Sequence, residues 1–107
     1  MRGMAALSED QVREGIADLP GWRLGKGEIV RNYLFPTFRD AVDFIVRIAE
    51  HAEAANHHPD LENSYNRVRI ALHTWSENAI TEKDIALAHA IESEAGKARP
   101  PSRRSEA

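Results

Sequence analysis

The longest run of helical periodicity in the chain begins after Pro36-Thr37. Apolar residues recur there three and four positions apart, and charged residues occupy the opposite side. The apolar stripe consists of Phe38, Ala41, Val42, Ile45, Ile48, Ala49 and Ala52. Thr37, followed three residues later by Asp40, is placed to cap the first turn. The pattern predicts a long amphipathic helix that packs on a flat apolar surface through one side only.

Shorter helices are predicted near both ends of the chain, each introduced by a capping pattern. Ser8-Glu9-Asp10-Gln11 has the form of a capping box, and we expect a helix over residues 9–18 that Pro20-Gly21 ends. Thr81 and Asp84 repeat this spacing before a last helix. The last helix is expected to end near Gly96 and to bury Ile85, Ala88, Ile91 and Ala95.

The remaining segments show the alternation of strands in two hairpins. The first hairpin joins residues 22–24 to residues 28–35 through a turn with two glycines, which reach positive φ at low cost. The second joins residues 60–64 to residues 68–75 through Tyr65-Asn66. In the last strand Val68, Ile70 and Leu72 face one side, and Arg69, Ala71, His73 and Trp75 face the other. This alternation predicts a half-buried strand of an antiparallel sheet.

The resulting order, α-β-β-α-β-β-α, predicts an α+β fold with a single four-stranded antiparallel sheet and three helices packed on one face. A chain of 107 residues suits one domain, which we place at residues 1–96. Residues 97–107 have no apolar pattern, and we expect a disordered tail there. Such a sheet leaves two edges open, and pairing of edges between copies would hide one of them. We therefore expect a homodimer or a higher closed assembly.

Composition excludes several classes of protein. The net charge of −3 and the pI near 5.9 disfavour a nucleic-acid partner, which calls for a basic face. The chain has no cysteine, which removes disulfides, thiolate nucleophiles and cysteine-ligated metals. No stretch approaches the roughly 20 apolar residues of a membrane span, and the N-terminus lacks the apolar run of a signal peptide. We expect a soluble cytoplasmic protein with no membrane association.

The stretch from Glu53 to Pro59 carries the most reactive side chains. The proline ends the helix and pushes His58 out of the helical region, so the rings of His57 and His58 should point in different directions. Histidine changes charge near neutral pH, so the pair suits proton transfer. A histidine that only satisfies carbonyls at a helix C-terminus would show the same pattern. A metal site is a further alternative, but the i, i+4 histidine pair of a zinc helix is absent, and we expect no metal.

Three other positions fit both a structural and a functional interpretation. Asp84 suits helix capping and the helix dipole as well as acid chemistry. Trp75 suits sheet packing and also stacking on a flat heterocycle. Glu53 suits a solvated position on a helix as well as a place in a functional site. No single position decides the function.

The combination is more specific. Glu53-x3-His57-His58-Pro59, followed by Tyr65, Trp75 and Asp84, resembles the motif of the pterin-4a-carbinolamine dehydratases. The similarity extends over about residues 7–95 through Tyr65-Asn66-Arg67-Val68, Thr81-Glu82-Lys83-Asp84-Ile85, Leu87-Ala88 and the order of elements. The resemblance implies dehydration of 4a-hydroxytetrahydrobiopterin to quinonoid dihydropterin, which recycles the tetrahydropterin spent by aromatic amino acid hydroxylases. It also implies no metal, no further cofactor, and α+β subunits that dimerise through their sheets and often pair into tetramers.

By position, the resemblance makes His57 and His58 the paired active-site imidazoles and Asp84 the final acid of the motif. It assigns the pterin site to Glu53, Asn56, His73, Thr74, Trp75 and Ser76. Vertebrate members carry a third histidine where this chain has Trp75, which cannot accept a proton. Either two histidines suffice, or His73 partly substitutes.

Three alternative functions remain open at this stage. The same scaffold would serve another pterin, such as the molybdenum cofactor or a folate derivative. It would also serve as a dimerisation cofactor for a transcription factor, as one animal relative does, or as a structural dimer in which the histidine pair only caps a helix. The sequence does not resolve the substituent at C6 of the pterin.

Overall fold

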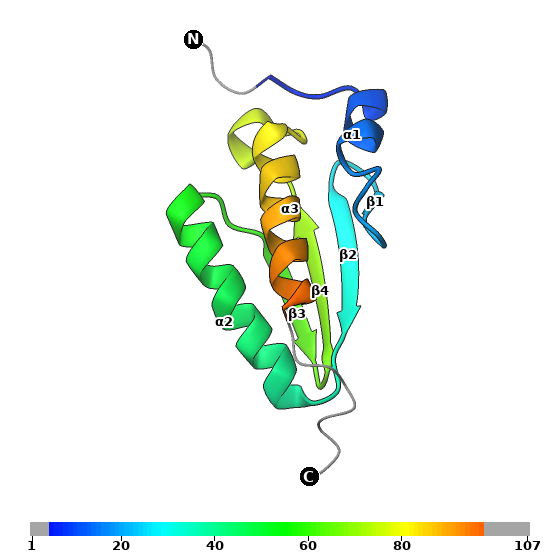
Figure 1. The fold of residues 1–107 in the computed structure, drawn as a ribbon. Coiled ribbons are helices and arrows are strands. Elements are labelled where there is room, and N and C mark those ends of the chain that lie inside the picture. Colours follow the sequence, from blue (N-terminus) through cyan, green and yellow to red (C-terminus); the bar gives the residue numbers. More distant parts are fainter. Residues whose placement is uncertain (1–4, 98–107) are drawn as a thin grey trace.

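The computed structural model describes residues 5–97 (Figure 1). Its elements are α1 (Glu9–Gly15), β1 (Arg23–Leu24), β2 (Ile29–Leu34), α2 (Phe38–Ala55), β3 (Asp60–Ser64), β4 (Arg67–Leu72), the short 3₁₀ helix η1 (Trp75–Glu77) and α3 (Glu82–Gly96). The predicted α+β fold and the predicted order of helices and strands are confirmed. The expected disordered tail lies outside the described residues, apart from Lys97, which caps α3. Within residues 5–97 no helix has the length and apolarity to cross a bilayer.

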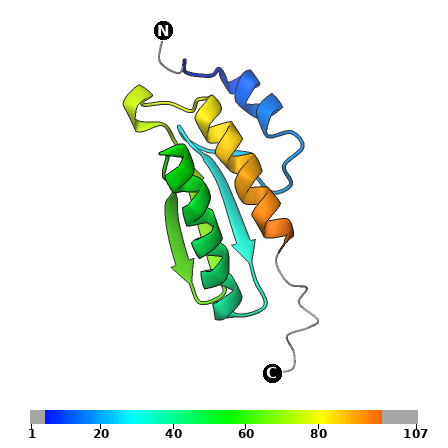
Figure 2. The same cartoon turned by 60° about the vertical axis from the view of Figure 1, so that its left-hand side comes forward.

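One antiparallel sheet holds the four strands in the order β1-β2-β4-β3. β2 and β4 pair along their whole length, from Ile29 opposite Leu72 to Leu34 opposite Arg67. α2 and α3 lie side by side over one face of this sheet (Figure 2). α1 packs against α3 through Gly15. This glycine lies so close to α3 that a Cβ added to it would be 3.0 Å from Cδ1 of Ile85. The core therefore fills the space between the sheet and one layer of helices.

The core confirms most of the predicted faces. Val68, Ile70 and Leu72 of β4 are fully buried, as the alternation predicted. Ala88 and Ile91 of α3 are fully buried too, and both predicted capping boxes are present, at Ser8 and at Thr81. These local patterns therefore predict where α1 and α3 begin, and which side of β4 and of α3 is buried.

The buried side of α2 differs from the predicted stripe. Phe44, which the prediction left out, is fully buried and contacts the rings of Tyr33 and Phe35 at centroid distances of 4.9 and 4.8 Å. Phe38, predicted to be buried, is 51% exposed, and Ala49 is exposed as well. Successive residues of a helix are 100° apart around its axis, so Phe38 and Ala49 both lie on one flank of the stripe that faces the sheet. That stripe consists of Ala41, Phe44, Ile48 and Ala52.

α1 is shorter than predicted. It ends at Gly15 rather than at residue 18, because Ile16 leaves the helical conformation with φ −108° and ψ 9°. The N–H of Ile16 still bonds back to the carbonyls of Val12 and Glu14, so the last turn is closed before the chain turns away. The prediction was therefore wrong by one turn.

β4 is also shorter than predicted. It ends at Leu72, whereas the alternation predicted a strand as far as Trp75. Thr74 instead forms a bridge with Ala79, and its N–H donates to the carbonyl of Ala79 at 2.9 Å, which closes a tight loop around η1. His73 and Trp75 consequently do not share a strand face. Their rings meet edge to face, with centroids 4.8 Å apart.

A charged cluster around Glu94 ties α3 to α2. The carboxylate of Glu94 accepts a hydrogen bond from Nε2 of His51 at 2.7 Å, and it lies 3.3 Å from Nε of Arg47 and 3.7 Å from Nζ of Lys97. The hydrogen bond from His51 is the main reason that the pKa of Glu94 is lowered. The charges of Lys97 and Arg47 act in the same direction, and burial opposes them.

We expect the substitution Glu94→Gln to destabilise the protein most at neutral pH. A carboxyl whose pKa is lower in the folded than in the unfolded chain stabilises the fold above its unfolded pKa. That contribution is lost as the pH falls through the folded pKa. Urea unfolding from pH 7 down to pH 3 should therefore show a loss that shrinks with pH. Glu50→Gln, at an exposed position of α2, is the matched control, and an equal loss at every pH for Glu94→Gln would contradict a charge effect.

Candidate active site

The end of α2 directs the two adjacent histidines to different sides. Asn56 caps the helix in the left-handed conformation, with φ 51° and ψ 44°, which asparagine tolerates better than most residues. The N–H of His57 then bonds back to the carbonyl of Ala52 at 3.1 Å, so His57 is held against the helix end. The side chain of His57 is 8% exposed and that of His58 is 55% exposed. The prediction that the two rings diverge is confirmed.

His57 is paired with a carboxylate from the other end of the domain. Its Nε2 lies 2.5 Å from Oδ1 of Asp84, which is fully buried at the start of α3. A ring N–H that donates to a carboxylate fixes both the tautomer and the orientation of the imidazole. Nδ1 of His57 has no hydrogen-bond partner within residues 5–97. This nitrogen is the one left to exchange a proton.

Asp84 is held by three donors. Besides His57, the hydroxyl of Thr74 donates to its Oδ2 at 2.7 Å, and the N–H of Thr81 donates to the same oxygen at 2.9 Å. The hydroxyls of Thr74 and Thr81 lie 2.8 Å apart, and both residues are buried. Because the Thr74 proton is engaged by Asp84, Thr81 is the donor between the two hydroxyls. Asp84 therefore serves as the N3 residue of the capping box and as the partner of His57 at once.

His58 has a different environment. Its Nε2 lies 2.8 Å from Oε2 of Glu53, and the side chain of Glu53 is 77% exposed. Solvent competes with such a pair, so its contribution to stability is small. The contact still orients the His58 ring, because Glu53 belongs to the last turn of α2 and the helix fixes its position.

A hollow of about 440 Å³ opens beside these histidines, a size in the range of small-molecule sites. We call it the histidine hollow. It is lined by Asn56, His57, His58, Pro59, Asp60, Thr74, Trp75, Ser76 and Lys83. The sequence had pointed to six of these as site residues, and it had not singled out Asp60 or Lys83. Both are direct neighbours of residues that it had singled out, Pro59 and Asp84, and this adjacency was the available signal.

The other predicted site residues lie around this hollow or apart from it. Asp84 lies behind His57, and Glu53 reaches the hollow only through His58. His73 lines a separate hollow of about 470 Å³, next to the turn between β1 and β2, which we call the hairpin hollow. Its lining consists of Lys26, Gly27, Glu28, Asp60, His73, Trp75 and Asn78. Trp75 is 73% exposed and lines both hollows.

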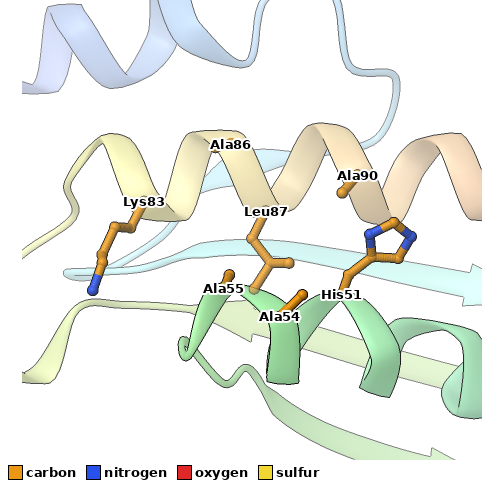
Figure 3. Close-up of a pocket in the computed structure, with 7 residues that line it drawn as sticks. All are labelled: His51, Ala54, Ala55, Lys83, Ala86, Leu87 and Ala90. Atoms are coloured by element: carbon orange, nitrogen blue, oxygen red, sulfur yellow. The ribbon is translucent and has the colours of Figure 1, made fainter.

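A groove of about 390 Å³ between α2 and α3 has a different character (Figure 3). It is lined by His51, Ala54, Ala55, Lys83, Ala86, Leu87 and Ala90. Four alanines and Leu87 make it largely apolar, and its one histidine is held by Glu94. The groove therefore offers a surface rather than acid-base chemistry. Residues 5–97 contain no group of three His, Asp or Glu side chains arranged to hold a metal ion.

Known proteins resemble this chain over most of its length. The family described as Pterin 4 alpha carbinolamine dehydratase matches residues 5–94. A Mycobacteroides abscessus protein provisionally named pterin-4-alpha-carbinolamine dehydratase is 43% identical over 94 residues, covering 88% of this chain and 100% of its own. A Chloroflexus aggregans protein with the same provisional name is 49% identical over 90 residues, covering 83% and 96%.

A solved structure agrees with these relatives. The crystal structure of a transcriptional coactivator/pterin dehydratase from Brucella melitensis matches this fold with a TM-score of 0.82 at 38% identity. The match covers 86% of this chain and 100% of that chain. The fold, the sequence identity and the length of the matches all point to the same family. The chain belongs to the pterin-4a-carbinolamine dehydratase family.

Proposed function

We propose that this protein dehydrates 4a-hydroxytetrahydrobiopterin to quinonoid dihydropterin by histidine acid-base catalysis. The observation that carries the proposal is the buried His57–Asp84 pair, whose imidazole lines a hollow that His58 and Trp75 also line. Membership of the family supports the reaction class, a hydro-lyase acting on a pterin. The product is the form that a reductase returns to the tetrahydropterin used by aromatic amino acid hydroxylases. A hydroxylase is accordingly a candidate functional partner.

The chemistry needs two proton movements. The C4a–O bond breaks, and the hydroxyl leaves as water when it receives a proton. N5 loses its proton, and the C4a=N5 double bond forms, so the net change is the loss of one water molecule. Because Asp84 engages Nε2 of His57, we assign the proton exchange to Nδ1. A positioned imidazole contributes about 10²–10⁴-fold to such a step.

Asp84 and Trp75 support this chemistry in different ways. The carboxylate of Asp84 stabilises the positive charge that the His57 ring gains whenever it holds two protons. The exposed indole of Trp75 offers a flat face against which the pterin ring can stack. His58, which also lines the hollow, then binds the substrate and assists the second proton movement.

The direct test of the proposal follows the decay of the carbinolamine. The intermediate is generated with a hydroxylase, and its absorbance is recorded by stopped flow with and without the purified protein. Accelerated decay that scales with the concentration of the protein is the expected result. If a folded protein leaves the decay at its spontaneous rate, the dehydratase proposal fails and a binding role remains.

His73 is expected to play no part in proton transfer. Its ring packs edge-on against Trp75 and lines the hairpin hollow rather than the histidine hollow. The pH–rate profile of the variant His73→Ala should therefore keep the shape of the wild-type profile. A limb of the profile that disappears with His73 would instead make it the substitute for the third histidine of vertebrate members.

We also propose that the working form is a homodimer or homotetramer. β1 and β3 are the edges of the sheet, and Leu34 on the face opposite the helices is 72% exposed. Burial of an open edge and of this apolar side chain favours association of two copies. Light scattering after size exclusion measures the mass directly. A monomer at micromolar concentration would contradict the proposal.

A transcriptional role is the second candidate, because the Brucella relative carries the name transcriptional coactivator beside pterin dehydratase. The largely apolar groove between α2 and α3 is a surface on which such a contact would be sought. Two variants separate the roles. Ala86→Asp, at an exposed position of the groove, would impair a contact there and spare dehydration, and His57→Gln would do the opposite.

A further inference from the structure

Asp84 lies at the end of a chain of buried hydroxyl groups. Its Oδ2 accepts from the hydroxyl of Thr74, which lies 2.8 Å from the hydroxyl of Thr81. Oγ1 of Thr81 in turn lies 3.2 Å from the backbone N–H of Lys83, in the first turn of α3. Thr74 is 3% exposed and Thr81 is fully buried, so water does not compete with these hydrogen bonds.

Every hydrogen bond of this chain runs in one direction. A hydroxyl carries a single proton and a carboxylate only accepts, so Thr74 donates to Asp84 and accepts from Thr81. Because the proton of Thr81 is engaged by Thr74, its oxygen accepts from the N–H of Lys83. Hydrogen bonds aligned in this way polarise one another inside a protein. The N-terminus of α3 is therefore connected through two hydroxyls to the carboxylate that faces His57.

The backbone of Thr74 is fixed as well as its side chain. Its N–H donates to the carbonyl of Ala79 at 2.9 Å, and its carbonyl accepts from the N–H of Ala79 at 3.3 Å. Oδ2 of Asp84 therefore has a fixed hydroxyl donor, while Oδ1 meets the ring of His57. Without this hydroxyl, the N–H of Thr81 would still hold Oδ2, but the carboxylate would be freer to turn about its Cβ–Cγ bond.

We infer that Thr74 is a positioning residue for the dehydration and that it acts through Asp84. Its hydroxyl holds Oδ2, so that Oδ1 stays aligned with the Nε2–H of His57 and Nδ1 stays free to exchange a proton. Its effect on kcat rests on the proposed function, whereas its hold on the ring of His57 does not. Thr74 also lines the histidine hollow, so direct contact with the substrate is the alternative that the test must exclude.

Two substitutions at position 74 separate the hydroxyl from the shape of the side chain. Thr74→Val removes the hydroxyl and keeps the shape, and Thr74→Ser keeps the hydroxyl. One net hydrogen bond corresponds to about 2–10-fold, so Thr74→Val should lower kcat by about 3–10-fold and leave KM unchanged. Thr74→Ser should restore most of the lost kcat. A raised KM with an unchanged kcat in Thr74→Val would make Thr74 a substrate contact and overturn the inference.

Thr37→Val is the matched control for loss of a capping hydroxyl. The hydroxyl of Thr37 accepts from the N–H of Asp40 at 3.0 Å and caps α2 at the end opposite to His57. This variant should lose stability, measured by urea unfolding, and should keep both kinetic constants. A loss of kcat in Thr37→Val as large as that in Thr74→Val would reduce the effect of Thr74 to general destabilisation and overturn the inference.

A double-mutant cycle tests whether Thr74 acts through Asp84. Residues of one hydrogen-bond network are not additive, so adding Thr74→Val to Asp84→Asn should lower kcat by less than about twofold. A further loss as large as the one that Thr74→Val causes in the wild-type background would overturn the inference, because Thr74 would then act independently of Asp84.

The ring N–H signal of His57 gives a reading that does not depend on activity. A proton donated to a carboxylate resonates far downfield, and ¹⁵N–¹H spectra separate it from the other ring protons. The signal should broaden or move upfield in Thr74→Val and stay in place in Thr74→Ser and Thr37→Val. An unmoved signal in Thr74→Val would overturn the inference. If the wild type leaves the carbinolamine at its spontaneous rate of decay, the proposed function fails alone, since this signal still decides whether Thr74 positions the ring.

Discussion

Replacing His57 by glutamine is expected to lower kcat/KM for dehydration by about 10²–10⁴-fold and to leave the protein folded. The amide of glutamine can still donate a hydrogen bond to Asp84, so the buried carboxylate keeps a partner. The amide cannot exchange a proton near neutral pH, so only the chemical step is removed. The decay of the carbinolamine at saturating and at limiting substrate separates the effect on kcat from that on KM.

Two further variants test whether the loss of activity is specific to His57. His58→Gln should cost less and should raise KM as well, because His58 is exposed and is assigned to binding and assistance. His89→Gln should change neither constant, since His89 lies near Gly15 and Asp18, away from the histidine hollow. A His57→Gln variant with wild-type kinetics would show that the pair with Asp84 is only a structural cap.

Replacing Asp84 by alanine is expected to destabilise the fold by about 3–5 kcal/mol and to abolish most of the activity. Three donors, from His57, Thr74 and Thr81, would lose their common acceptor inside the protein. The free energy of unfolding by urea measures the loss. Asp43→Ala, on the exposed side of α2, is the control and should cost little.

Asp84→Asn separates the structural role of this residue from its chemical role. The asparagine amide has the shape of the carboxylate but presents a donor to one side of a site that holds only donors. The variant should stay folded with a lower free energy of unfolding, and kcat for dehydration should fall, since the His57 ring loses the carboxylate that orients it. A wild-type kcat would restrict Asp84 to capping α3.

The local patterns of the sequence predicted most of the fold. Ser8 and Thr81 each combine a side-chain oxygen with an N3 residue, and such boxes depend on four consecutive residues only. The divergence of His57 and His58 follows from Pro59 in the same way. These features need no knowledge of distant contacts, and all of them are present in the structure.

The features that the sequence missed depend on contacts between distant residues. Phe44 is buried because Tyr33 of β2 and Phe35, just after that strand, pack against it, which the helical pattern alone does not show. β4 ends early because Thr74 pairs with Ala79 and bonds to Asp84. The same loop turns Trp75 away from a strand face.

The division of the site into two hollows was not predictable either. It depends on the turn between β1 and β2 approaching the loop around η1, which no local pattern encodes. Lys83 and Asp60 became candidates only when the hollow that they line was known. Sequence thus indicated the reactive groups, and the structure added which of them share a hollow.

The most direct test of the central claim is whether a pterin binds beside His57 and His58. The chain has five histidines, so ¹⁵N–¹H spectra of their rings give a small and resolvable set of signals. On titration with 7,8-dihydrobiopterin, the ring signals of His57 and His58 should shift while those of His51 and His89 stay in place. Shifts confined to His51 or His89, or no shift at saturating ligand, would contradict the claim.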